Sequence, residues 1–465
     1  MGNNIDRRQF LTFVAGGAAA GLIPFSGCKS ELADPIANKT QRPNIIFILA
    51  DDLGYGDLGC YGQKHIKTPN IDRIAAEGIR FTQHYAGSTV CAPSRCVLMT
   101  GLHTGHTAVR GNREIKPEGQ YPIAAETITV AKVLKRAGYI TAVVGKWGLG
   151  GPGSSGVPNK QGFDHWFGYL CQRKAHSYYP EYLWKNGKKV ILEKNKAGKK
   201  GTYSHDLFTA EAMDFIRQNR NRRFFLYLPY TIPHTRYEIP STEPYSDRPW
   251  AKKEKVHAAM ITRMDRDIGR IMNLLKKLNI DEKTIVFFSS DNGAAQRWEG
   301  RFDSSGLLRG RKRDMYEGGI RTPLVVRWPG KIKPAAESDH ISAFWDFLPT
   351  CAELAGVSAP EDIDGISMVP TLLGRDDRQK RHKFLYWEFF HWKKGFYLAV
   401  RMGDFKVVRL GPTGPLELYN LKTDIAEKNN IAAEHPEIIA EIEAYLKTAR
   451  TDSPHWPVMP PKNNK

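Results

Sequence analysis

Short runs of consecutive apolar residues recur along the chain and predict buried strands. The clearest run, at residues 44–50, reads Asn-Ile-Ile-Phe-Ile-Leu-Ala. Similar runs lie at 140–144, 224–228, 284–288 and 324–326. A strand that is covered on both faces needs apolar residues on both, so continuous runs are typical of the interior of a parallel sheet.

One long stretch between these runs has helical periodicity. From 256 to 278, apolar residues recur every three or four positions, at Val256, Met260, Met264, Ile268, Ile271 and Leu275. This spacing places them on one face of an α-helix and indicates that the methionines are core residues. Strands that alternate with helices predict an α/β fold with a mainly parallel central sheet.

The pattern changes after about residue 384. Short alternating segments at 396–400, 405–410 and 417–419 predict antiparallel strands, and a polar helix is expected near 436–449. We therefore expect a main domain over 43–380 and a smaller α+β subdomain over 381–465. The last residues, 451–465, are expected to form a loose tail.

The N-terminal residues predict an export signal. Residues 6–11, Asp-Arg-Arg-Gln-Phe-Leu, resemble a twin-arginine motif, and a small, apolar run follows. Residues 25–28, Phe-Ser-Gly-Cys, resemble a lipobox, in which Cys28 becomes the lipidated first residue. A plain cleaved signal with an incidental cysteine is the alternative. We expect a signal peptide at 1–27, a tether at 28–42, and an exported periplasmic or cell-surface lipoprotein attached to a membrane through Cys28.

Polar residues with oxygen ligands follow two of the predicted strands. Asp51 and Asp52 come directly after the run 44–50, and Asp291 and Asn292 follow the run that begins at 284. Because the carboxyl ends of parallel strands meet at one edge of a sheet, the four side chains are expected to form one anionic pocket. Such a pocket requires a hard cation, and Ca²⁺ or Mg²⁺ suits it. Either pair taken alone is explained as loop capping.

The segment from Cys91 to Gly101, Cys-Ala-Pro-Ser-Arg-Cys-Val-Leu-Met-Thr-Gly, carries the most specific signal. Its C-x-P-S-R cluster, which closes in T-G, resembles the signature of the type I sulfatases. In that family the cysteine is oxidised to formylglycine, whose hydrate attacks sulfur and then expels sulfate. Pro93 suits the first turn of a helix, which places Cys91 at a helix N-terminus, where free amides favour an anion.

Further segments match the same family in the same order. They are residues 145–150, Gly-Lys-Trp-Gly-Leu-Gly, the Pro-His pair at 233–234, and residues 312–323, Lys-x-x-x-Tyr-Glu-Gly-Gly-x-Arg-x-Pro. The resemblance implies an alkaline-phosphatase-like α/β sandwich with a mixed, mainly parallel central sheet flanked by helices, and a C-terminal antiparallel sheet with a terminal helix. It implies a metal site, with calcium as the ion, formed by Asp51, Asp52, Cys91, Asp291 and Asn292. It also implies catalytic and sulfate-binding roles for Cys91, Arg95, Lys146, His234 and Lys312.

One position departs from the family pattern. Many sulfatases carry histidine after the tryptophan of G-K-W, whereas this chain has Gly148. Since glycine cannot move a proton, we hypothesise that His103 or His106 compensates as the base for sulfate release.

The segment that follows G-K-W suggests how substrate is bound. Residues 171–179 combine arginine, histidine and aromatic side chains, which suit a sugar subsite and equally a surface loop with aromatic anchors. We expect Arg173, His176 and Asp303 to contact a sulfated glycan, with a galactose-type sugar favoured. The formal charge of +19 suits such a polyanion. No compact Lys/Arg block or familiar nucleic-acid-binding module is found in the sequence, so we expect no nucleic acid.

Two alternatives to a glycan sulfatase stay open. One is a phosphonate or phosphodiester hydrolase of the same superfold with the same nucleophile, and the other is a non-catalytic lipoprotein that binds sulfated glycan. A binding protein is expected to lose Cys91 or a metal ligand, and this chain keeps them. Modification of Cys91 implies a partner, either a formylglycine-generating enzyme or an anaerobic sulfatase-maturating enzyme, which acts before export of the folded chain.

Overall fold

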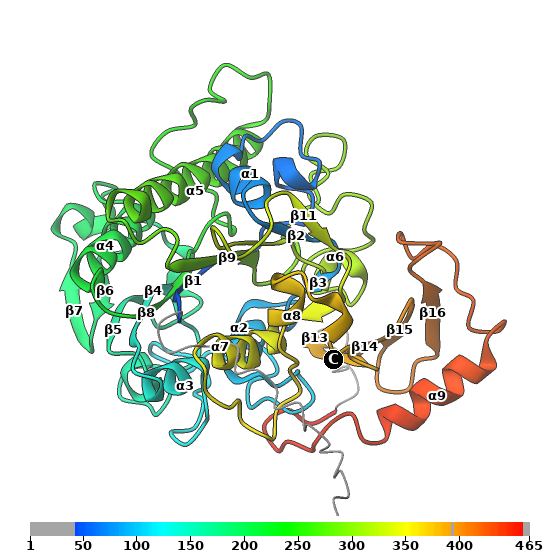
Figure 1. Cartoon of the computed structure of the whole chain (residues 1–465). Helices are drawn as coiled ribbons and strands as arrows, with labels where there is room; N and C mark the ends of the chain where they lie inside the picture. Colours follow the sequence, from blue (N-terminus) through cyan, green and yellow to red (C-terminus); the bar gives the residue numbers. More distant parts are fainter. Residues whose placement is uncertain (1–41, 392–394, 459–465) are drawn as a thin grey trace, which may run out of the picture. The chain divides into compact units, whose positions relative to one another are not determined.

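The computed structural model of the chain describes residues 42–391 and 395–458 (Figure 1). The predicted signal peptide and Cys28 lie outside these residues. Among the described residues, no helix has the length and apolar character needed to cross a membrane.

A ten-stranded mixed sheet forms the centre of the fold. In spatial order its strands are β11 (Ala336–Ser338), β2 (Ile79–Phe81), β10 (Leu324–Arg327), β9 (Thr284–Ser290), β1 (Asn44–Ala50), β8 (Phe224–Pro229), β4 (Ile140–Lys146), β5 (His165–Tyr169), β6 (Tyr182–Lys185) and β7 (Lys188–Ile191). The strands β9, β1, β8, β4 and β5 run parallel to their neighbours in this group. The five apolar runs of the sequence are all strands of this sheet, which confirms a mainly parallel centre.

One of the five predicted strands runs in the opposite direction. β10 pairs antiparallel with β9, with Val325 opposite Phe288. Both strands are buried along their whole length. An unbroken apolar run therefore indicates that both faces of the strand are buried, but it does not indicate the direction of the strand.

Helices cover both faces of the sheet and bury alternate residues of β1. Ile46 and Ile48 belong to a core that includes apolar residues of α1 (Pro69–Ala76), α4 (Ser204–Asn219) and α5 (Lys252–Lys277). Ile45, Phe47 and Leu49 belong to a second core with α2 (Cys91–Thr100), α3 (Val130–Arg136) and α7 (Phe347–Leu354) (Figure 1). The six residues of the stripe predicted between 256 and 278 are all buried in α5. Short elements complete this part: β3 (His84–Tyr85), β12 (Ser342–Ala343), α6 (Glu317–Ile320) and α8 (Val369–Leu372).

A four-stranded antiparallel sheet follows, with β13 (Leu385–His391), β14 (Gly395–Met402), β15 (Phe405–Leu410) and β16 (Leu416–Asn420) in chain order. Three of these strands and the terminal helix α9 (Pro436–Leu446) were predicted, and Ile442 of α9 is buried in the same cluster as Val400 and Val407. The domain boundary at residue 380 stays a prediction.

The expected loose tail is wrong for residues 451–458. The amide of Thr451 donates to the carbonyl of Gly105, and the indole of Trp456 donates to that of Ala108 at 2.8 Å. These residues have hydrogen-bond partners in a distant loop, which a reading of local composition cannot show.

Candidate active site

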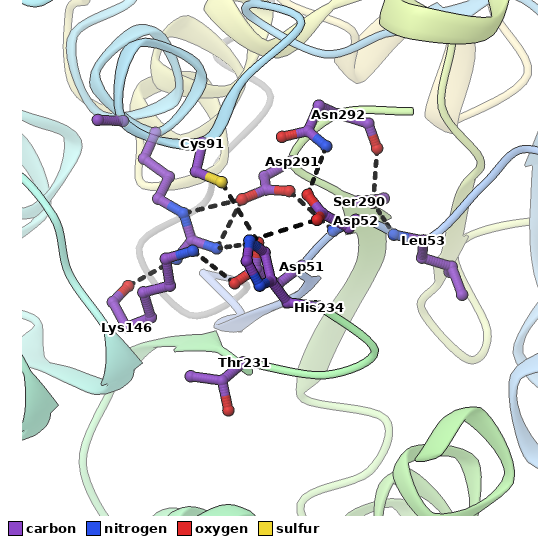
Figure 2. Close-up of polar contacts among 12 residues, drawn as sticks. Asp51, Asp52, Leu53, Cys91, Lys146, Thr231, His234, Ser290, Asp291 and Asn292 are labelled. Carbon is purple, nitrogen blue, oxygen red and sulfur yellow. Dashed lines mark hydrogen bonds and ion pairs between the residues drawn. The ribbon is translucent and has the colours of Figure 1, made fainter. Parts of the chain in front are cut away.

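The two acidic segments meet because β1 and β9 are neighbours in register. Ala50 lies opposite Ser290, so Asp51 and Asp291 leave the sheet side by side. The amide of Asp52 donates to Oδ1 of Asp291 at 3.2 Å, and Nδ2 of Asn292 donates to Oδ1 of Asp52 at 2.8 Å. Figure 2 shows the four side chains together. The pocket expected from the sequence is therefore formed.

Two buried oxygen atoms of this pocket suit a hard cation. Within the described residues, Oδ1 of Asn292 and Oδ2 of Asp52 accept no hydrogen bond. Nδ1 of His234 lies 3.0 Å from the carbonyl oxygen of Thr235 and 3.3 Å from its hydroxyl oxygen. When Nδ1 carries the proton and donates to the carbonyl, Nε2 of the neutral ring is an acceptor, and it lies 3.4 Å from Oδ2 of Asp52. Buried oxygen atoms that accept no hydrogen bond are suited to bind a divalent hard cation, for which carboxylate and amide oxygens are the usual ligands.

Three buried cations pair with the three carboxylates. Nε and Nη2 of Arg95 lie 3.0 and 2.7 Å from Oδ2 of Asp291. Lys146 pairs with Asp51 at 2.5 Å, and Lys312 pairs with Asp52. Because these charges balance, a divalent cation and an anionic substrate can bind together without leaving a large uncompensated charge.

The protonation of the acids follows from burial and these neighbours. Burial and the nearby Asp51 carboxylate together raise the pKa of Asp291 to about 6, although Arg95 opposes the shift. Burial also disfavours ionised Asp51, but Lys146, His234, Arg95 and Lys312 together hold its pKa well below its usual range.

Cys91 is the first residue of α2 and lies 2% exposed beside the acids. Its Sγ atom is 3.4 Å from Oδ1 of Asp51 and 3.4 Å from Nζ of Lys312. All ten residues of α2 are buried, so the helix is held firmly behind Cys91. Burial, followed by the charge of Asp291, raises the pKa of the thiol to about 12. As an unmodified side chain, Cys91 is therefore an uncharged thiol and a poor nucleophile.

One of the three predicted substrate residues lies in the site. The ring of His176, from the short 3₁₀ helix η4 (Lys174–His176), stacks on that of His234 with centroids 4.3 Å apart and an interplanar angle of 19°. Burial, followed by the neighbouring His234, lowers the pKa of His176 to about 3. Arg173 instead pairs with Glu114 at 2.6 Å, and the carboxylate of Asp303 accepts from the amide of Gly300. Their contact with substrate stays a prediction.

His103 and His106 lie elsewhere. Both rings contact Asp364, and they stack on each other with centroids 4.2 Å apart. They follow the C-terminal end of α2, whereas Cys91 begins that helix, and ten helical residues span about 15 Å. The hypothesis that either histidine acts at Cys91 is not supported.

Glycine at position 148 suits both its backbone conformation and its close neighbour. Its φ is +86°, and a Cβ atom added there would lie 1.8 Å from Nε2 of Gln172. The side chain of Gln172 thus occupies the space that a histidine at this position would need. The sequence analysis placed Gln172 within the segment 171–179 but did not select it, because it belongs to none of the matched motifs.

Comparisons with known proteins identify the family. A family model described as Sulfatase matches residues 43–357, and one described as N-sulphoglucosamine sulphohydrolase, C-terminal, matches residues 310–452. An N-acetylgalactosamine-6-O-sulfatase of Bacteroides thetaiotaomicron is 30% identical and covers 93% of this chain and 98% of its own length. Arylsulfatase A of Homo sapiens is 34% identical over 79% of this chain and 74% of its own length. The crystal structure of Ps i-CgsB in complex with k-i-k-neocarrahexaose has a TM-score of 0.79 and 29% identity, covering 90% of this chain and 95% of that one.

The chain belongs to the sulfatase family. It is accordingly an enzyme of the sulfuric ester hydrolase class. The alkaline-phosphatase-like fold class expected from the sequence is confirmed by the central mixed sheet, the separate antiparallel sheet and the likeness to solved structures.

Proposed function

We propose that this enzyme hydrolyses sulfate esters of a carbohydrate through a formylglycine formed from Cys91. The observation that carries the proposal is the position of Sγ of Cys91, at 3.4 Å from both a carboxylate of the acidic pocket and the ammonium group of Lys312. The names of the relatives support the substrate class, since one is an N-acetylgalactosamine-6-O-sulfatase and another was solved with k-i-k-neocarrahexaose. We favour a galactose-type sugar.

The chain's own residues supply the binding and the proton transfers. Formylglycine supplies a geminal diol, of which one hydroxyl group is the nucleophile and the other permits release of sulfate. Lys146 and Lys312 hold sulfuryl oxygens, and Lys312 is also the candidate acid for the leaving oxygen. His234 contacts the sulfuryl group on the leaving side. Arg95 orients Asp291 and also donates to the carbonyl of Lys146 at 2.6 Å, so it positions both sides of the site.

A calcium ion is the proposed cofactor, with magnesium as the second choice. Asp51, Asp52, Asp291 and Asn292 would hold it, together with the modified side chain at position 91. When bound, the ion polarises the sulfate and the nucleophile.

The remaining proposals concern the maturation and location of the enzyme. We propose that a formylglycine-generating or anaerobic sulfatase-maturating enzyme modifies Cys91 before export. The twin-arginine and lipobox resemblances support an exported lipoprotein anchored through Cys28.

Mass spectrometry of the peptide that contains Cys91, on protein from its native host, tests the proposal together with sulfate release from a panel of sulfated sugars. Formylglycine with release of sulfate is expected. An unmodified thiol in a fully active enzyme would overturn the formylglycine mechanism. Glycan binding without release would favour a binding protein, and turnover of phosphonates or phosphodiesters in preference to sulfated sugars would overturn the substrate assignment.

A further inference from the structure

Gln172 is a buried glutamine whose amide group lacks partners. It lies 5% exposed, and within the described residues neither Oε1 nor Nε2 forms a hydrogen bond. Gln379, which is 9% exposed, shows the usual arrangement. Its Oε1 accepts from Thr371, and its Nε2 donates to the carbonyls of Ser367 and Lys380, both at 2.9 Å. A buried polar group without a partner destabilises the fold, which indicates that the side-chain amide of Gln172 has a function.

The backbone that follows Lys146 holds this amide in place. Lys146 lies opposite Tyr169 in the pairing of β4 with β5, and the amide of Gly148 donates to the carbonyl of Leu170 at 3.2 Å. Nε2 of Gln172 fills the space next to Gly148, where any Cβ atom would overlap it. The side-chain amide of Gln172 therefore contacts Gly148, two residues beyond Lys146, which pairs with Asp51.

The other end of the same segment also reaches the site. The amide of Ala175 donates to the carbonyl of Cys171, and His176 stacks on His234. Gln172 thus belongs to a short segment, residues 172–176, that begins near Lys146 and ends beside His234.

We infer that Nε2 of Gln172 donates a hydrogen bond to an oxygen atom of the sulfuryl group bound in this site. The inference rests on the proposed function and adds a substrate-binding residue to it. A neutral donor suits this place, because Arg95, Lys146 and Lys312 already balance the three carboxylates. An additional cation would disturb that balance, whereas a carboxamide adds a directed hydrogen bond without charge.

Two variants of Gln172 test the inference, with inorganic sulfate as the probe in calorimetric titration and sulfate release as the second measurement. Gln172→Ala is expected to raise the Kd for sulfate about tenfold, the loss of one hydrogen bond to an anion. It should also lower kcat/KM by about 10²-fold, the range found when one donor to a developing oxyanion is removed. Gln172→Glu keeps the size of the side chain and should weaken sulfate binding further, because its charge repels the anion.

Gly148→Ala provides an independent route to the same result. The new Cβ atom displaces the amide of Gln172, so its effect on sulfate affinity should match that of Gln172→Ala, and the double variant should show little additional loss. Gln379→Ala is the matched control, since it removes a buried glutamine outside the site and should lower thermal stability without changing the Kd for sulfate.

An unchanged Kd for sulfate in both folded Gln172 variants would overturn the inference. A raised KM for the sulfated sugar with unchanged sulfate affinity would also overturn it, because the amide would then contact the sugar. Failure of the wild-type enzyme to bind or release sulfate is a different result, since it would overturn the proposed function itself.

Discussion

The ammonium group of Lys312 lies 3.4 Å from Sγ of Cys91 and also donates a hydrogen bond to Oδ1 of Asp52. The lysine and the cysteine are 221 residues apart in the sequence. One cation thus links the position of the nucleophile to the acidic pocket, and any anion that is attacked at residue 91 must lie close to it.

Lys312→Ala should therefore lower kcat/KM for sulfate release by about 10²–10³-fold, as loss of a preorganised charge in such sites does. Lys312→Arg keeps the charge and should retain more activity. The exposed Lys188 offers a control, because Lys188→Ala should turn over normally. Wild-type rates for Lys312→Ala would exclude Lys312 from the site.

Arg95→Ala should destabilise the fold. The guanidinium group and Asp291 are both fully buried, so the variant leaves a carboxylate without its partner. Such a change costs about 3–5 kcal/mol, which urea unfolding can measure. Arg173, whose side chain is 57% exposed in its pair with Glu114, gives the comparison: Arg173→Ala should leave the free energy of unfolding almost unchanged. Equal effects of the two substitutions would contradict the burial of the Arg95 pair.

Removal of the metal should lower the unfolding temperature. Calcium bound in the acidic pocket stabilises the native state, by about 2.7 kcal/mol when the free calcium concentration is 100 times its Kd. A chelator removes the ion and with it this stabilisation. Addition of calcium should restore the unfolding temperature, and magnesium should do so less well. In Asp52→Asn the response to calcium should be weak. A chelator response of the same size in that variant would place the ion elsewhere.

The contribution of His84 to stability should fall as the pH decreases from 7 to 5. Burial lowers the pKa of His84 to about 3, so the native ring stays neutral while the unfolded ring is protonated below its ordinary pKa of about 6.5. The contribution of this residue is therefore present above about pH 6.5 and is lost as the pH falls toward 3, amounting to about 2 kcal/mol between pH 7 and 5. Urea unfolding at several pH values measures it. His84→Gln has no titrating group at this position, so the difference in stability between the wild type and this variant should shift against the wild type by about 2 kcal/mol between pH 7 and 5.

Turnover should not depend on His106. His106 pairs with Asp364 beyond the far end of α2, so His106→Ala should release sulfate at the wild-type rate. His234→Ala should slow the reaction by about 10²–10³-fold, the usual effect of removing one preorganised contact to a reacting anionic group. A large loss of rate in His106→Ala would revive its role as a base.

Much of the site could be predicted from the sequence because its parts are local. The apolar run at 44–50 identifies a buried strand, and the carboxylates of Asp51 and Asp52 come immediately after it. Cys91 precedes a proline in the first turn of a helix, so its place at the helix N-terminus follows from short-range geometry. Strands and helix ends depend on residues that are close together in the sequence, so their patterns can be recognised in the sequence directly.

The tertiary structure decided the relationships that depend on distant residues. It set the antiparallel direction of β10, the stacking of His176 on His234, and the separation of His103 from Cys91. It also placed the amide of Gln172 against Gly148, a contact that no motif contains. These contacts depend on which strands pair and how loops close over them, and many sequences satisfy the same local pattern. The sequence by itself therefore determined the residue types of the site and the elements that carry them, whereas long-range packing determined which of those residues meet.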